Sequence, residues 1–156
     1  MVKMRFVIFI IMFFASTVGW AHQWKCVSVN IYKRTYNFVA DEWRYEKSLD
    51  IDVLKSSFDK KNESFLLSIQ AKSINYLSYN QIYDFYYIDK NGSFFKIDKV
   101  PCDIESVGYM VQGGNPMNLS FRLPESKKFN NVLLDVKVRN VQSGDIYIIR
   151  VLYEYT

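Results

Sequence analysis

Apolar and polar residues alternate along four stretches of the chain, at residues 27–31, 48–53, 64–72 and 132–139. In the first of these the order is Val-Ser-Val-Asn-Ile. Alternation with a period of two puts apolar side chains on one face of a strand and polar side chains on the other. Antiparallel sheets with one face in the core and one face in water have this pattern, so the four stretches predict strands.

Three short turn sequences each separate two predicted strands. The strongest turn signal is Asn91-Gly92, because an Asn-Gly pair accepts positive φ at little cost. We expect hairpins at Lys90-Asn91-Gly92 between residues 82–89 and 93–100, at Gly113-Gly114-Asn115-Pro116 between 107–112 and 117–123, and at Gln142-Ser143-Gly144 between 132–140 and 145–155.

Together these patterns indicate eight or nine strands, spaced about 8–14 residues apart. We therefore predict an all-β fold with one domain over residues 22–156, a single antiparallel β-sandwich of immunoglobulin-like type. A β-barrel is the alternative. Residues 41–47 and 53–61 are each expected to hold a short helical turn.

The composition agrees with a packed β domain. Of 156 residues, 49% are hydrophobic, 23% are charged and 17% are aromatic, with 12 Tyr and 12 Phe. This apolar content excludes a disordered chain.

The first residues have the features of a secretory signal peptide. Lys3 and Arg5 precede an apolar run over residues 6–15, and small residues follow. The run has about ten residues, whereas a membrane-spanning helix needs about twenty. We predict that residues 1–21 are a signal peptide cleaved after Ala21, or alternatively after Gly19, so that the protein is periplasmic or secreted. An uncleaved membrane anchor is the remaining alternative.

Removal of the leader changes the interpretation of charge. Residues 1–21 contain Lys3 and Arg5 and no acid, so the net charge falls from +4 to +2. This value does not indicate nucleic-acid binding. We expect no nucleic-acid partner and no stable membrane span after cleavage.

Cys26 and Cys102 are the two cysteines. In an exported protein they are expected to form a disulfide, which would stabilise the fold by about 4 kcal/mol on the chain-entropy model. Two free thiols or an intermolecular bond are the alternatives. With one His, the chain cannot complete a Cys/His zinc site without carboxylates, so no metal and no cofactor are predicted.

The sequence does not indicate an enzyme. His22 is the one histidine, and the usual hydrolase, nucleotide-binding and metalloprotease motifs are missing. Paired carboxylates acting on a polysaccharide stay open, although Asp50 and Asp52 are better explained as a solvated strand face. Asp89 and Asn91 are typical of a hairpin tip.

The stretch from residue 76 to 87 is the richest in aromatic residues. Such rings either pack in the core or form an exposed platform for a sugar or a protein. Alternation puts Tyr83 and Phe85 on one face and Tyr86 on the other. The binding residues that we predict, in this stretch and in the neighbouring loop, are Tyr76, Tyr79, Tyr83, Tyr86, Gly113, Gly114 and Asn115.

The end of the chain resembles the final strand of chaperone–usher fimbrial subunits. The resemblance rests on Gly144 and on the alternating residues Tyr147, Ile149, Val151, Tyr153 and Tyr155. It implies a strand that pairs with an assembly chaperone, in a sandwich completed by a neighbouring subunit. The chain departs from that family in having no donor segment before Cys26 and in its widely spaced cysteines.

These observations lead to three functional hypotheses. The first is an exported, non-enzymatic binding protein of inhibitor, immunity or glycan- or protein-binding type, with a protein or glycan partner in the cell envelope or outside the cell. The second is a fimbrial or surface structural subunit. The third is a carboxylate-dependent enzyme acting on polysaccharide.

Overall fold

The computed structural model describes residues 23–72, 76–98, 100, 102–104, 110–112, 115–122 and 129–156, with only the backbone described at residues 76, 79–82, 102–104 and 110–112. The leader predicted at residues 1–21 lies outside this part. The described residues form eleven strands. They are β1 (Trp24–Asn37), β2 (Glu42–Lys47), β3 (Ile51–Asp59), β4 (Ser64–Ala71), β5 (Tyr76–Ile88), β6 (Phe94–Ile97), β7 (Cys102–Ile104), β8 (Met110–Gln112), β9 (Met117–Arg122), β10 (Asn131–Asn140) and β11 (Ile146–Tyr155).

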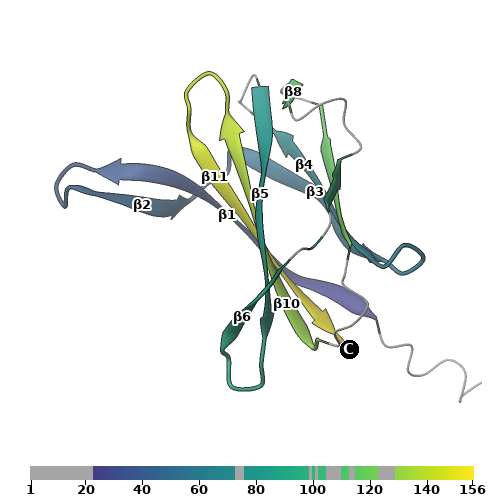
Figure 1. Ribbon diagram of the computed structural model, residues 1–156. Coiled ribbons are helices and arrows are strands. Elements are labelled where there is room, and N and C mark those ends of the chain that lie inside the picture. The colour runs from purple at the N-terminus through teal and green to yellow at the C-terminus, as the bar shows by residue number, and fades with distance from the viewer. Residues whose placement is uncertain are drawn as a thin grey trace, which may run out of the picture.

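The strands form two antiparallel sheets (Figure 1). The larger sheet has the order β2-β1-β11-β10-β5-β6, with β8 paired to β5. The smaller sheet has the order β3-β4-β9-β7. The prediction of an all-β, antiparallel fold is confirmed.

Aromatic rings join the inner faces of the two sheets. The ring centroid of Phe65 on β4 lies 4.5 Å from that of Tyr153 on β11 and 5.5 Å from that of Phe85 on β5. Phe121 on β9 lies 5.7 Å from Phe85. Each of these side chains is buried. Burial of one large apolar side chain stabilises a fold by roughly 1.5–3 kcal/mol. The sheets therefore pack face to face around one core.

Two of the three predicted hairpins are confirmed. β5 and β6 pair across the Asn91-Gly92 turn, where Gly92 has φ +81° and the Asp89 carboxylate accepts the Asn91 and Ser93 N–H groups. β10 and β11 pair across the turn that contains Gly144, with φ +78°. In both turns glycine supplies the positive φ that the connection needs.

The second predicted hairpin is wrong. β8 pairs with β5 in the larger sheet, whereas β9 pairs with β4 and β7 in the smaller sheet. The chain therefore passes from one sheet to the other between residues 112 and 117. Turn residues between two apolar stretches mark a change of direction, and they do not show which strands become neighbours.

The two predicted helical turns are also wrong, because β2 and β3 are strands that pair with β1 and β4. Counting these segments as strands explains part of the difference between the eleven strands of the described residues and the eight or nine that were predicted. The turn before β2 has Asp41 at φ +52°, and the turn before β4 has Glu63 at φ +50°. Side-chain oxygens of Asn37 and Asp59 accept backbone N–H groups inside these turns, so neither turn needs glycine or proline.

One hairpin projects beyond the two sheets. β1 pairs with β11 from Trp24 to Lys33 and with β2 from Tyr32 to Asn37, so that beyond Lys33 its described partner is β2 alone. We call residues 34–47 the arm. Figure 1 shows the arm extending away from the sheets as a two-stranded ribbon.

Candidate interaction surface

One face of the arm is aromatic. In the β1–β2 register Arg34 is opposite Tyr45 and Tyr36 is opposite Trp43, so the four side chains lie on the same face. Trp43 is 57% exposed and Tyr45 is 45% exposed. The rings of Tyr36 and Trp43 meet edge to face at 5.2 Å, and the Arg34 guanidinium lies 4.3 Å from the centre of the Trp43 ring. Cation–π and ring contacts therefore order this face although it lies in water.

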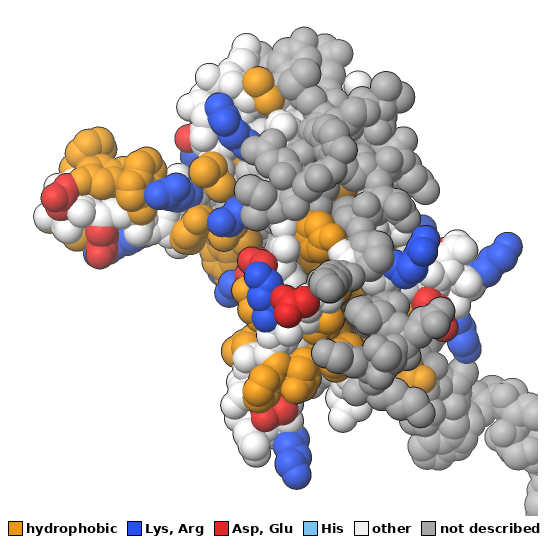
Figure 2. All heavy atoms as spheres, in the orientation of Figure 1, with side chains coloured by type: hydrophobic (Ala, Val, Ile, Leu, Met, Phe, Trp, Pro, Cys, Tyr) orange, Lys and Arg blue, Asp and Glu red, His pale blue; other side chains and the backbone are white. Residues whose placement is uncertain are grey.

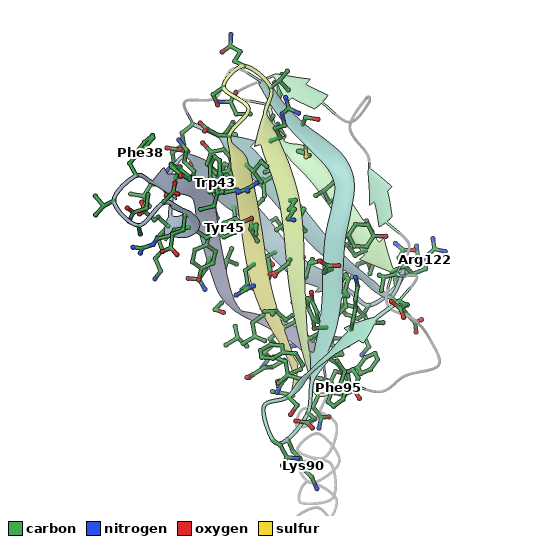
Figure 3. All side chains as sticks on the ribbon, turned by 60° about the vertical axis from the view of Figure 1, so that its left-hand side comes forward. Phe38, Trp43, Tyr45, Lys90, Phe95 and Arg122 are labelled. Carbon is green, nitrogen blue, oxygen red and sulfur yellow. The ribbon has the colours of Figure 1, made fainter. Side chains whose placement is uncertain are left out.

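The tip of the arm is apolar. Phe38 is 86% exposed and Val39 is 99% exposed, and they are the most exposed large apolar residues in the described part of the chain. Phe38 also meets the Tyr36 ring edge to face at 4.9 Å. Figure 2 shows hydrophobic side chains gathered along one side of the arm, and Figure 3 shows Phe38, Trp43 and Tyr45 on it. The rings of the tip and of the face form one continuous surface.

The opposite face of the arm is charged. Glu42, Arg44 and Glu46 alternate with the aromatic residues of β2, and Arg44 pairs with Glu42. The arm is therefore an amphipathic hairpin with water on both faces. Free apolar surface of this kind usually marks a contact site.

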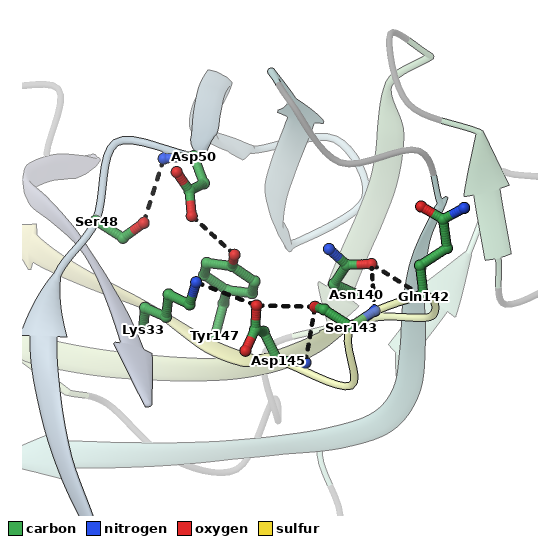
Figure 4. A network of polar contacts seen from close by, with 8 residues as sticks. All are labelled: Lys33, Ser48, Asp50, Asn140, Gln142, Ser143, Asp145 and Tyr147. Atoms are coloured by element: carbon green, nitrogen blue, oxygen red, sulfur yellow. Dashed lines mark hydrogen bonds and ion pairs between the residues drawn. The ribbon is translucent and has the colours of Figure 1, made fainter. Parts of the chain in front are cut away.

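Polar side chains connect the base of the arm to the sheets (Figure 4). The Lys33 ammonium lies 3.1 Å from the Asp145 carboxylate, in the turn before β11. The Tyr147 hydroxyl donates to Asp50, on the connection between β2 and β3, at 2.8 Å. The Asp50 N–H donates to Ser48 Oγ at 3.2 Å. Lys33 directly precedes the arm, and Asp50 lies shortly after it, so the first two contacts hold the chain to β11 and its turn on both sides of the arm.

The same contacts shift two ionisable groups. Burial, and then the hydrogen bond to Asp50, raise the pKa of Tyr147, so this phenol stays neutral in the physiological range. The Ser143 hydroxyl, and then Lys33, hold the pKa of Asp145 below its ordinary value of 3.8. Both effects favour the protonation states that hold the base of the arm in place.

The structure places the predicted binding residues in different environments. The Tyr83 ring packs 5.0 Å from Phe121, and its hydroxyl donates to the Val100 carbonyl. Tyr86 lies on the other face of β5, beside Phe94, and Asn115 is exposed. Tyr83 and Tyr86 are therefore not brought to one surface. The side chains of Tyr76 and Tyr79, and the whole of Gly113 and Gly114, lie outside the described residues.

The two cysteines lie on different sheets. Cys26 is half-buried on β1, and Cys102 lies on β7, where only the backbone is described. β1 contacts β3 at one end of the smaller sheet, whereas β7 is at the other end of that sheet. The Cys26–Cys102 bond therefore stays a prediction, and this strand order does not support it.

The acidic residues considered from the sequence have structural partners. Asp50 accepts the Tyr147 hydroxyl, Asp52 forms an ion pair with Lys72 at 2.9 Å, and Asp89 caps the β5–β6 turn. Among the described residues, no three His, Cys, Asp or Glu side chains form a group that could hold a metal ion.

Sequence reasoning missed the arm as an interaction surface. The available signal was the spacing of aromatic residues on both sides of the turn at 38–41, with Tyr36 before it and Trp43 and Tyr45 after it. These residues alternate with charged ones, which is a strand pattern. Glu, Arg and Lys also favour helix, so the same residues are compatible with the helical turn predicted at 41–47.

Comparison with known proteins gives no relative. No protein-family model matches the chain, and no curated protein sequence and no solved structure shows significant similarity to it. In the part of the chain that the structure describes, no helix has the length and apolarity to cross a bilayer.

Proposed function

We propose that this chain is an exported, non-enzymatic binding protein that acts in the periplasm or outside the cell, and that it holds a protein partner on the aromatic face of the arm. The observation that carries the proposal is the ordered cluster of exposed rings around Trp43 on a hairpin that projects from the body. Export rests on the predicted leader.

The strand order supports an immunoglobulin-like body to which the arm has been added. From β3 onwards, the order β3-β4-β9-β7 corresponds to strands A-B-E-D, and β11-β10-β5-β6 corresponds to G-F-C-C′. β1, β2 and β8 have no place in this pattern; β1 and β2 lie beside the strand that corresponds to G, and only the first part of β1, which includes Trp24, packs against the core. The sandwich does not need the arm to cover its core, and this favours a role in recognition.

The geometry of the rings favours a protein over a glycan. Trp, Tyr and Arg are the residue types that contribute most to binding energy at protein interfaces. A sugar ring stacks on a flat aromatic surface, whereas Tyr36 and Trp43 are inclined by 66° and Phe38 and Tyr36 by 82°. Rings inclined to one another in this way do not present the flat surface that a sugar ring needs.

The alternative functions have less support. In an incomplete sandwich the last strand would border a vacant position, but β11 pairs with β1 on one side and with β10 on the other. The described acids that suggested polysaccharide chemistry are engaged in the ion pairs, hydrogen bonds and turn cap given above. A binding protein is therefore the function that the geometry supports best.

Site-specific photo-crosslinking tests the proposal. The photoreactive residue p-benzoylphenylalanine replaces Phe38 at the tip of the arm or, as a control, Lys90 at the tip of the β5–β6 hairpin, which points elsewhere (Figure 3). In cells that produce the full chain naturally, we expect irradiation to attach a different protein at position 38 and not at position 90. The substitution Trp43→Ala should abolish the adduct.

Mass spectrometry of the adduct identifies its composition. Equal crosslinking at both positions, or no adduct with a different protein at position 38, would contradict the proposal. An adduct with twice the mass of the chain would consist of two copies of it, so it would not count as capture of a different protein.

A further inference from the structure

The outer edge of β2 carries backbone groups that point away from the molecule. The Ser48 N–H donates to the Ile31 carbonyl at 2.9 Å, and these two residues continue the β1–β2 register. Hydrogen-bonded and non-hydrogen-bonded pairs alternate along an antiparallel ladder. The backbone groups of Glu42, Arg44 and Glu46 therefore point toward β1, and those of Trp43, Tyr45 and Lys47 point outward.

The arm has fewer strands than an independent sheet needs. An isolated two-stranded hairpin is marginally stable in water, and three or more strands are normally required. All six residues of β2 are exposed, and the described residues place no third strand beside them. An edge of this kind is a template for strand pairing with another chain.

The charges on β2 select one register with a second copy of the same strand. Two-fold symmetry requires antiparallel pairing in which side chains of the same face are opposite each other. If the two-fold axis passes at Arg44, Arg44 is opposite itself and Glu42 is opposite Glu46 on both sides of the axis. All three pairs are then repulsive. Centring on Tyr45 puts Arg44 opposite Glu46 twice, which is attractive in both pairs.

The register centred on Tyr45 also uses the outward backbone groups fully. Tyr45 is opposite Tyr45 of the second copy, and Trp43 is opposite Lys47 on both sides of the symmetry axis. These are the three residues whose N–H and C=O groups point outward, so the ladder closes six backbone hydrogen bonds. Centring on Trp43 would bring Asp41 into the ladder, and Asp41 has the turn conformation with φ +52°.

We propose that the chain forms a two-fold symmetric dimer in which β2 pairs antiparallel with β2 of a second copy, with Tyr45 opposite Tyr45. The four strands β1-β2-β2-β1 make one sheet, and the aromatic faces of both arms lie on the same side of it. The proposal concerns the edge of the arm, so it stands independently of the partner proposed for the face.

A charge exchange tests the register. In sedimentation equilibrium of the protein purified after expression of the full chain, we expect a dimer at about 100 µM. Arg44→Glu and Glu46→Arg each bring like charges together in both central pairs, so each should weaken dimerisation about ten-fold or more. The double variant Arg44→Glu/Glu46→Arg restores opposite charges and should dimerise like the natural protein.

Lys96→Glu is the matched control, since Lys96 is exposed and paired with Asp84 at the far edge of the same sheet. It should leave dimerisation unchanged. A natural chain that is monomeric at this concentration would overturn the proposal. So would a dimer that resists both single charge changes, or a double variant that stays as weak as the single ones.

Oxidative crosslinking of tyrosines provides a second, independent measurement. Photo-oxidation with persulfate joins neighbouring tyrosine rings, and the register puts the two Tyr45 rings side by side. Tyr45→Phe should remove the covalent dimer and leave the sedimentation result unchanged. Tyr155→Phe, whose ring is equally exposed (44% against 45%), should retain it. A covalent dimer that persists in Tyr45→Phe would contradict the register.

Discussion

The body and the arm use the same aromatic side chains in opposite environments. In the body Phe65 is completely buried and contacts Trp24, Phe85 and Tyr153 of the larger sheet, and its neighbour Phe58 in the smaller sheet. In the arm the rings of Tyr36, Phe38 and Trp43 contact one another and Arg34, and Phe38, Trp43 and Tyr45 are exposed to water.

This difference in exposure separates rings that stabilise the fold from rings that, under the proposed function, contact a partner. Burial of rings between the sheets contributes to the free energy of folding, because the rings leave water when the chain folds. The rings of Phe38, Trp43 and Tyr45 keep 45–86% of their surface in water, so cover by another molecule would add to the free energy gained from their burial. Under the function proposed above, the aromatic residues have two roles, which experiments can separate by position.

Truncation of a core ring should have the largest effect. Phe65→Ala removes a ring from the centre of the core and leaves a cavity, so we expect a loss of about 3–5 kcal/mol in the free energy of unfolding. Phe38→Ala, the same substitution at the tip of the arm, should cost less than about 0.5 kcal/mol. Urea denaturation measures both, and similar losses at the two positions would show that the tip is packed.

The base of the arm should respond to pH. Because the pKa of Asp145 is lowered in the fold, its carboxylate stabilises the fold above the unfolded value of 3.8, and this contribution is lost as the pH falls from there through the lowered value. We expect the stability difference between the natural protein and Asp145→Asn to shrink between pH 5 and pH 2, with the natural protein losing more. Urea titrations at several pH values measure this, and a constant difference would mean that Asp145 does not stabilise the base.

The smallest effect concerns solvent access and not stability. Trp24 is buried in the body, and Trp43 is exposed on the arm. In protein prepared without residues 1–21, which contain Trp20, acrylamide should quench much of the tryptophan fluorescence, and the emission that remains in Trp43→Phe should be blue-shifted and better protected. Unfolding free energies of the two proteins should agree within about 0.5 kcal/mol. Equal quenching in both would mean that Trp43 is covered.

The sequence predicts the local features of the fold well. Gly92 and Gly144 both adopt the positive φ that their turn sequences indicate, and the alternating residues of β4 and β10 face the core as expected. These features depend on backbone preferences and on period-two alternation, and both are written in neighbouring residues.

Two kinds of feature were not predictable from neighbouring residues. The turns at Asp41 and Glu63 adopt positive φ without glycine, because side chains of Asn37 and Asp59 hold them. The separation of β8 and β9 into different sheets depends on partners far along the chain. The exposure of Trp43 was hidden for a further reason, since aromatic residues in a strand pattern are normally explained by burial.

The position of β11 between β1 and β10 has a consequence for the timing of assembly. β1 is the first described strand and β11 the last, so their ladder joins residues that are 114 (Lys33 and Tyr147) to 131 (Trp24 and Tyr155) positions apart in the sequence. Loops of that length close slowly, because much chain entropy is lost before the contacts form. We therefore expect the β1–β11 ladder to form late in folding.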